Sequence, residues 1–248
     1  MRLLETHSCE GGATVGYMRS GWDVTAVDID ANHARYNPVP VVIADAAAYI
    51  REHGHEYDAI HASPPCQWYT RGNAARRGTQ GHEAAWNRSI PEIRNAIERV
   101  GKPYVIENVA DAAWDMIDPV TLCGCMFDLS AIDTDGIRIH LQRPRLFETN
   151  WGLRAPRPCD HTEHEWVAGA YGGARRDKYE AKYVRKGGYV PPDKEVVKAL
   201  LGIEHDMTWN GLYESLPPAY TKYIGDELMS VWRPGSYQPL DRGVLFDA

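Results

Sequence analysis

The first thirty residues constrain the fold most, because they have the pattern of one strand, one helix and a second strand. The apolar pair Leu3-Leu4 precedes a glycine-containing turn, and apolar residues at helical spacing then run from Val15 to Met18. A glycine stop at Gly21 precedes a second apolar run, which ends in Asp28. Strands that alternate with helices in this way predict an α/β fold, with a mostly parallel, doubly wound sheet and helices on both faces.

The same segment favours a nucleoside cofactor. Gly11 and Gly12 allow a ligand to approach the backbone, and Asp28 is placed to accept hydrogen bonds from ribose hydroxyls. A complete Gly-x-Gly-x-x-Gly pattern and the lysine of a P-loop are both missing, so a cofactor without phosphates, such as S-adenosylmethionine, fits better. A plain strand-helix-strand unit with an exposed acid is the alternative for this segment taken alone.

A cysteine on a stiff turn follows a later strand. The run from Tyr57 to Ser63 predicts a strand that stops before Pro64-Pro65-Cys66-Gln67. Two prolines restrict the backbone and exclude a helix, so they hold the Cys66 thiol in a fixed position, as a nucleophile requires. A buried cysteine that acts as a small apolar residue is the alternative.

A carboxylate follows the next short strand. Tyr104-Val105-Ile106 leads into Glu107-Asn108-Val109. Groups at the carboxyl ends of neighbouring parallel strands face one crevice, so we expect Cys66 and Glu107 to meet there. Such a pair suits addition of a thiolate to an electron-poor double bond, while an acid of raised pKa protonates a ring nitrogen. For Glu107 alone, helix capping is the alternative.

Taken together and in this order, these motifs resemble the DNA cytosine carbon-5 methyltransferase family, particularly its compact phage and bacterial members. The resemblance runs from residue 1 to about 232 and is weaker between 150 and 205. It departs from the family at Cys9, where a first glycine is common, and it lacks a glutamine two residues before Arg143. The matching residues are the turn at Gly11-Gly12, Asp28, Pro65-Cys66-Gln67, Glu107-Asn108-Val109, Arg143-Pro144-Arg145-Leu146-Phe147 and a last motif from Leu216 to Gly225.

The resemblance implies a Rossmann-like methyltransferase fold and a mechanism. Cys66 adds to carbon 6 of a cytosine flipped out of double-stranded DNA, Glu107 protonates N3, and carbon 5 takes the methyl group of S-adenosylmethionine. Arg145, with Arg143 as partner, holds O2 of the base. The resemblance also implies which residues contact the cofactor. Asp28 contacts the ribose, Ile29 and Asp45 contact the adenine, and Pro65 makes a further contact. The methionine part is contacted by His7, Ser8, Cys9, Glu10, Gly11 and Gly12.

Local charge indicates where DNA binds, although the net charge is −7. From Tyr171 to Lys194 there are seven basic residues against three acids, a balance of +4, interleaved with glycines and tyrosines. A second candidate is the stretch that follows the nucleophile. A solvated surface loop is the alternative for both segments. The expected DNA contacts are Arg175, Arg176, Lys182 and Arg185 in the first segment and Gln67, Arg71, Arg76 and Arg77 in the second.

Length and composition fit one α/β core with a small appendage. We expect a cofactor-binding and catalytic domain over 1–150, a target-recognition region over 151–205 and a segment over 206–248 that returns to the catalytic domain. The short recognition region predicts a short target or a relaxed sequence preference. No apolar stretch is long enough to cross a membrane, and we expect a cytoplasmic monomer in a bacterium or a phage-infected host. Restriction-modification, phage genome protection and solitary methylation fit the sequence equally well.

Five cysteines without a secretion signal predict reduced thiols. Two groups, Cys123-Gly124-Cys125 and Cys159-Asp160-His161 with His164, contain residue types that bind metals. The second group lacks the Cys-x-x-Cys pairing typical of structural zinc sites, so we expect turn and core residues here and no metal.

Two other functions remain open at this stage. One is carbon-5 modification of free pyrimidine nucleotides, as in thymidylate synthase-like proteins, which predicts a folate site and phosphate-binding arginines. The other is a catalytically silent DNA-binding relative. The turn before Asp28 favours an adenosyl cofactor over the first, and the presence of Cys66, Gln67 and Glu107 together argues against the second.

Overall fold

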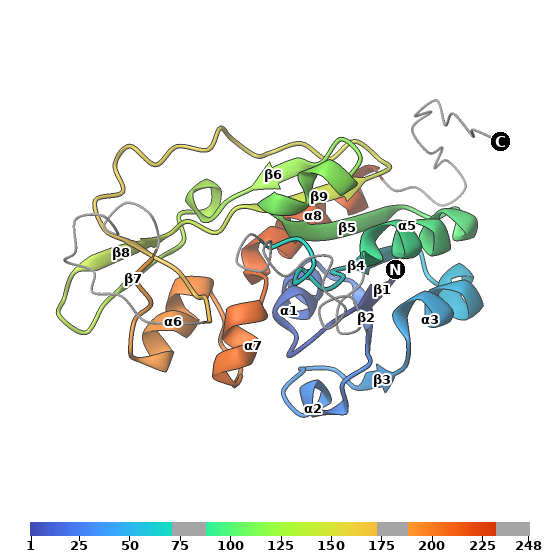
Figure 1. The fold of residues 1–248 in the computed structure, drawn as a ribbon, viewed down its shortest axis with the longest axis horizontal. Helices are drawn as coiled ribbons and strands as arrows, with labels where there is room; N and C mark the ends of the chain where they lie inside the picture. Colours follow the sequence, from blue (N-terminus) through green and yellow to red (C-terminus); the bar gives the residue numbers. More distant parts are fainter. Residues whose placement is uncertain (71–87, 173–187, 232–248) are drawn as a thin grey trace.

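A seven-stranded, mostly parallel sheet forms the centre of the protein (Figure 1). The computed structural model describes residues 1–70, 88–172 and 188–231. The first five strands in the order below are parallel, and β9 is antiparallel to both of its neighbours. The spatial order is β3 (Val41–Ile43), β2 (Asp23–Asp28), β1 (Arg2–Thr6), β4 (Ala59–Ala62), β5 (Tyr104–Val109), β9 (Arg145–Thr149) and β6 (Val120–Leu122).

Helices cover both faces of this sheet, because its strands are apolar on both sides. Leu4 and Ile60 pack in one cluster with α3 (Ala46–His53) and α5 (Ser89–Val100). Their neighbours in the sequence, Leu3 and Ala59, point to the opposite face and pack with α1 (Gly12–Arg19) and α8 (Pro218–Val231). Alternate residues of a strand point to opposite faces, so the near-continuous apolar runs are what a doubly covered parallel sheet requires.

The last helix, α8, packs on α1 of the first crossover unit. Gly16 on α1 lies against the Pro218 carbonyl and the Thr221 hydroxyl on α8, where any side chain would overlap them. Thr221 donates its hydroxyl to the Ala13 carbonyl at 2.9 Å, and Trp22 donates its indole N–H to the Gly225 carbonyl at 3.2 Å. Close backbone packing thus joins the two ends of the described chain.

A smaller, three-stranded sheet lies beside the large one. Its strands are β10 (Val167–Ala168), β8 (Arg138–Leu141) and β7 (Ser130–Ile132), and α6 (Lys194–Leu201) and α7 (Trp209–Glu214) pack in the same apolar cluster. The chain passes from the large sheet to the small one twice, after β6 and again after β9. The small sheet therefore takes strands from both sides of residue 150.

Shorter elements complete the described chain. They are α2 (Ala31–Ala34) and the 3-10 turns η1 (Gly54–Glu56), η3 (Ala110–Asp115) and η4 (Gly124–Phe127). The predicted fold class, an α/β fold with a mostly parallel sheet and helices on both faces, is confirmed. Among the described residues, no helix has the length and the apolar character needed to span a membrane.

Candidate active site

Cys66 lies on a turn that leaves the carboxyl end of β4. The Pro64 carbonyl accepts a hydrogen bond of 2.9 Å from the Asn108 side-chain amide on β5. Beyond the thiol, the Cys66 carbonyl accepts hydrogen bonds from the backbone N–H of Tyr69 and from the hydroxyl of Thr70. Hydrogen bonds therefore hold the turn both before and after the side chain of Cys66, which is half-buried. Its position therefore depends on β5 as well as on the two prolines.

A buried tyrosine anchors the end of this turn. The Tyr69 hydroxyl donates to Asp115 at 2.7 Å and accepts the backbone N–H of Ile90 at 3.3 Å. Arg88 donates to the same Asp115 carboxylate from Nε at 2.9 Å and also from Nη2. Burial, reinforced by the hydrogen bond to Asp115, raises the pKa of Tyr69. The neutral hydroxyl thus ties the residues after Cys66 to η3 and to the start of α5.

Glu107 lies on β5 and Arg145 on β9, two neighbouring strands that pair antiparallel. The β5–β9 register places Arg145 opposite Val109 and Phe147 opposite Glu107, so the two charged side chains are diagonal neighbours on one face. Nε of Arg145 lies 3.3 Å from Oε1 of Glu107, and the two side chains are only 12% and 9% exposed. A buried carboxyl is thereby paired with one guanidinium.

Burial dominates the electrostatics of the thiol and of the carboxyl. It raises the pKa of Cys66, and the neighbouring Glu107 carboxylate raises it further, whereas the Thr70 hydrogen bond and Arg145 lower it. Burial also raises the pKa of Glu107 against the opposing effect of Arg145. The site thus favours a protonated Glu107 carboxyl over a wider pH range than water does, which suits a proton donor.

Arg143 lies behind the wall of the site. Its guanidinium is fully buried and donates to the carbonyls of Ala170 and Tyr213, each at 2.6 Å. Burial and repulsion from Arg145 lower its pKa to about 10. Arg143 lines neither of the two cavities described below, whereas Arg145 lines both. Arg143 thus connects the segment after β10 to α7 through these two hydrogen bonds. The direct contact to the base that was predicted for Arg143 stays a prediction.

Two cavities meet at the thiol. One, of about 430 Å³, runs from Asp28 and Ile29 to Cys66 and Glu107. The other, of about 480 Å³, opens between the Cys66 turn and α7. Their shared lining residues are Cys66, Gln67, Val109, Arg145, Tyr213 and Glu214. The predicted meeting of Cys66 and Glu107 in one crevice is therefore present in the structure.

The first cavity gathers most residues predicted to bind the cofactor. Its wall includes His7, Ser8, Cys9, Glu10, Gly12, Asp28, Ile29 and Pro65. Gly11 and Asp45 do not line it. Gly11, with φ of 89°, lies against Pro38. Asp45 caps α3 by accepting the Ala48 N–H at 2.8 Å.

The turn between β1 and α1 is held in an unusual conformation. His7 and Cys9 have φ of 58° and 46°, in the left-handed region that side chains other than glycine rarely adopt. Asp28 stabilises this turn by accepting the backbone N–H of Cys9 at 2.8 Å, and it also accepts the N–H of Asp30 at 2.9 Å. Backbone strain that a buried carboxylate maintains is typical of ligand-binding loops.

Comparison with solved structures supports the fold. The chain is similar to a DNA modification methyltransferase encoded within an E. coli prophage, with 13% identity, a TM-score of 0.56 and coverage of 93% of this chain and 99% of that chain. It is equally similar to the S. pombe Dnmt2 methyltransferase, with 13% identity, a TM-score of 0.56 and coverage of 93% and 98%. The chain has the fold of these methyltransferases. No protein-family model matches the sequence, and no curated protein matches it either.

Within this methyltransferase fold, Glu5 is a cavity residue that the sequence reasoning missed. It lies on β1, is 1% exposed and lines the first cavity. Burial, the largest cause, raises its pKa to about 8. Its place in an apolar strand was the available signal, because a carboxylate is rarely buried without a partner or a function.

Residues of the C-terminal segment also line the first cavity, and the sequence reasoning missed those that precede Leu216. The lining residues are Met207, Tyr213, Glu214, Ser215 and Leu216. Glu10 fastens this segment, because its carboxylate accepts both the backbone N–H and the hydroxyl of Thr208 at 2.6 Å. Glu10 therefore holds α7 in place, and only the motif from Leu216 onward was visible in the sequence.

The predicted DNA contacts are mostly outside the described residues. Gln67 lines both cavities. Arg71, Arg76 and Arg77, and likewise Arg175, Arg176, Lys182 and Arg185, fall in the ranges 71–87 and 173–187, which the structure does not describe. Their DNA-binding roles remain predictions.

Proposed function

We propose that this protein is a DNA cytosine carbon-5 methyltransferase that uses S-adenosylmethionine. The observation that carries the proposal is the meeting of two cavities at Cys66, with Glu107 and Arg145 beside the thiol. One cavity suits a nucleoside cofactor, and the other suits a base that enters from outside. A thiol, an acid and a guanidinium at the junction are the groups that pyrimidine activation needs.

The first cavity fits the cofactor chemically. At one end lie Asp28 and the exposed Ile29, which we assign to the ribose and the adenine. Further in, the Ser8 hydroxyl and Oε2 of Glu5 are buried without a hydrogen-bond partner among the described residues. Buried polar atoms without partners are costly, and the polar groups of a methionine moiety would satisfy them. When bound, S-adenosylmethionine supplies an electrophilic methyl group.

The chain's own residues prepare the base for that methyl group. Cys66, as the thiolate, forms a bond to carbon 6, and Glu107 gives its proton to N3, so that electron density accumulates at carbon 5. Arg145 donates hydrogen bonds to O2 and stabilises the charge that develops there. After carbon 5 has accepted the methyl group, a water molecule takes the proton from carbon 5, the bond from carbon 6 to sulfur breaks to release the Cys66 thiolate, and Glu107 regains the proton from N3.

Duplex DNA is the proposed substrate, and the base must leave the stack to reach Cys66. Flipping costs a few kcal/mol, which contacts to the extruded base and to phosphates repay. Gln67, beside the thiol in both cavities, is placed to contact the strand from which the base departs. We assign the phosphate contacts to the basic residues of 71–87 and 173–187, on the basis of their charge in the sequence.

A covalent trap tests the proposal without knowledge of the target sequence. Duplex DNA in which every cytosine is replaced by 5-fluorocytosine is incubated with the protein, with and without S-adenosylmethionine. Fluorine cannot leave as the proton does, so we expect a denaturation-resistant adduct that requires the cofactor and that peptide mass spectrometry places on Cys66. The Cys66→Ala variant should form no adduct and should still bind the cofactor. An adduct on another cysteine, or DNA methylation by Cys66→Ala, contradicts the mechanism.

A further inference from the structure

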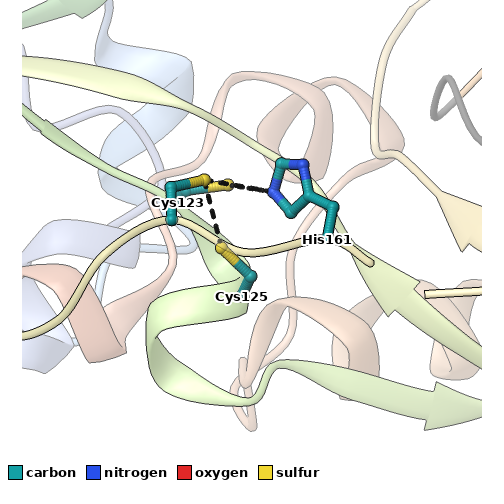
Figure 2. Close-up of side chains that lie close together, drawn as sticks. Cys123, Cys125 and His161 are labelled. Carbon is teal, nitrogen blue, oxygen red and sulfur yellow. Dashed lines mark hydrogen bonds between the residues drawn. The ribbon is translucent and has the colours of Figure 1, made fainter. Parts of the chain in front are cut away.

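A second group of thiols lies away from both cavities. Cys123 directly follows β6, Cys125 lies in η4, and Cys159 and His161 belong to the segment between β9 and β10. The four potential ligand atoms, three sulfurs and one imidazole nitrogen, all lie within 4.8 Å of one another. Figure 2 shows the side chains of Cys123, Cys125 and His161 turned toward a common centre.

The distances match those of a tetrahedral metal site. Nε2 of His161 lies 3.3 Å from the Cys123 sulfur and 3.2 Å from the Cys159 sulfur, and the sulfurs of Cys125 and Cys159 are 3.3 Å apart. Zinc-to-sulfur bonds of about 2.3 Å and zinc-to-nitrogen bonds of about 2.0 Å place neighbouring ligands roughly 3.6 Å apart. Small side-chain movements are therefore enough to surround an ion. A disulfide, by contrast, requires about 2.05 Å between sulfurs.

The ligand types select the ion. Three thiolates and one imidazole are the donors that Zn²⁺ prefers, whereas Mg²⁺ and Ca²⁺ prefer oxygen. Four protein ligands leave no open coordination position, which is typical of a structural site and not of a catalytic one. We propose that Cys123, Cys125, Cys159 and His161 bind one structural Zn²⁺.

The backbone around the ligands is shaped for such a site. Gly124, between two of the cysteines, packs against the Leu141 carbonyl so closely that no side chain fits there. Arg157 donates to the Cys125 carbonyl at 2.6 Å and so connects the two ligand-bearing segments. Cys123 and Cys125 are buried, whereas Cys159 is exposed and His161 is partly exposed. The ion therefore has a route in from solvent.

The position of the cluster explains what the zinc does. One ligand pair lies on the passage from β6 to β7, and the other lies on the passage from β9 to β10. These are the two places where the chain crosses from the large sheet to the small one. Residues 150–166 contain no helix or strand, so few backbone hydrogen bonds hold this segment. A zinc ion here would link the two connecting segments and so fix the orientation of the small sheet relative to the large sheet.

Spacing along the chain could not identify this site, since neither pair is Cys-x-x-Cys and the pairs are far apart in sequence. The expectation of turn and core residues without metal is therefore revised by the proposal. His164, the fifth candidate, stacks on His140 at 4.2 Å and on His161 at 5.6 Å between ring centroids, but it does not belong to the group of potential ligands. It provides the matched control.

The test measures metal in the full-length protein, purified under reducing conditions with any affinity tag removed. We expect one Zn²⁺ per chain by plasma mass spectrometry, and X-ray absorption at the zinc edge should give three sulfurs and one nitrogen. Replacement by Co²⁺ should give the intense visible bands of a tetrahedral thiolate site. Protein without zinc, a coordination shell of oxygens, or a Cys125–Cys159 disulfide would each overturn the proposal.

Variants separate binding from folding. Cys159→Ser and His161→Asn should lose most of the zinc and unfold at a lower temperature, whereas His164→Asn should retain it. A chelator should lower the melting temperature of the wild type and of His164→Asn, and zinc should restore it. If His161→Asn fails to fold, the wild-type stoichiometry and absorption spectrum still decide the question. Retention of zinc by both ligand variants contradicts the assignment.

Discussion

The pairing of Arg145 with Glu107 makes a prediction that does not depend on catalysis. At 3.3 Å and an effective dielectric constant of about 20, two unit charges attract by roughly 5 kcal/mol. Desolvation of both groups offsets much of this, so we expect a net coupling of about 1 to 3 kcal/mol. This coupling should appear in the free energy of unfolding when Glu107 is ionised, and it should decrease when Glu107 is protonated.

The sign of the pH dependence follows from the raised pKa of Glu107. A group whose pKa is higher in the folded state contributes stability at low pH and loses that contribution as the pH rises through the folded value. Arg145 opposes this loss because it stabilises the carboxylate. Removal of the guanidinium should therefore raise the pKa of Glu107 further and enlarge this loss, so the destabilisation caused by Arg145→Ala should be larger at pH 9 than at pH 5.

Urea unfolding at several pH values measures the effect, with Arg145→Ala, Glu107→Gln and the double variant forming a thermodynamic cycle. The control is Arg51→Ala, which removes an exposed guanidinium on α3 and should change stability by less than about 0.5 kcal/mol at every pH. A coupling near zero at pH 9, or one that does not change between pH 5 and pH 9, would refute the electrostatic reasoning.

Three further predictions concern the first cavity and the contact between α1 and α8. Asp28→Ala should weaken S-adenosylmethionine binding by about 1 to 3 kcal/mol in calorimetry, and unchanged affinity would place the ribose elsewhere. Gly16→Ala should destabilise the protein by about 1 to 3 kcal/mol through overlap with α8, whereas Gly172→Ala, whose nearest neighbour would be Tyr213 at 3.5 Å, should change stability little. The pKa of Glu5, raised to about 8, predicts that the protein loses stability as the pH rises through that value. Glu5→Gln should remove this loss. If the free energy of unfolding has the same pH dependence in the variant as in the wild type, Glu5 is solvated.

Local sequence patterns predicted the elements that hold the site. Prolines end β4 before Cys66, and the two apolar runs become β4 and β5 as expected. These features depend on backbone restrictions and on apolar periodicity, which act over a few residues. The α/β class follows from the same signals, because the alternation of strand and helix has few solutions.

The contacts that each polar side chain makes could not be predicted from local sequence patterns. The sequence placed Arg143 and Arg145 together, yet only Arg145 reaches the cavity, because β9 directs it toward Glu107 while Arg143 turns to the carbonyls of Ala170 and Tyr213. Glu10, expected at the cofactor, is also tied to Thr208, far along the chain. Which partner a polar group meets depends on segments that are distant in sequence.

The sequence by itself determined the sheet, its helical cover and the thiol on its proline turn, since short-range sterics and apolar patterning specify these. Only the tertiary structure decided that two cavities meet at Cys66, that Glu5 is buried with a pKa raised to about 8, and that Cys123, Cys125, Cys159 and His161 converge. The convergence of the four side chains depends on the crossings between the two sheets, and the cavities and the burial of Glu5 depend on long-range packing. No local pattern encodes the distance between side chains that the folded chain brings together from remote positions.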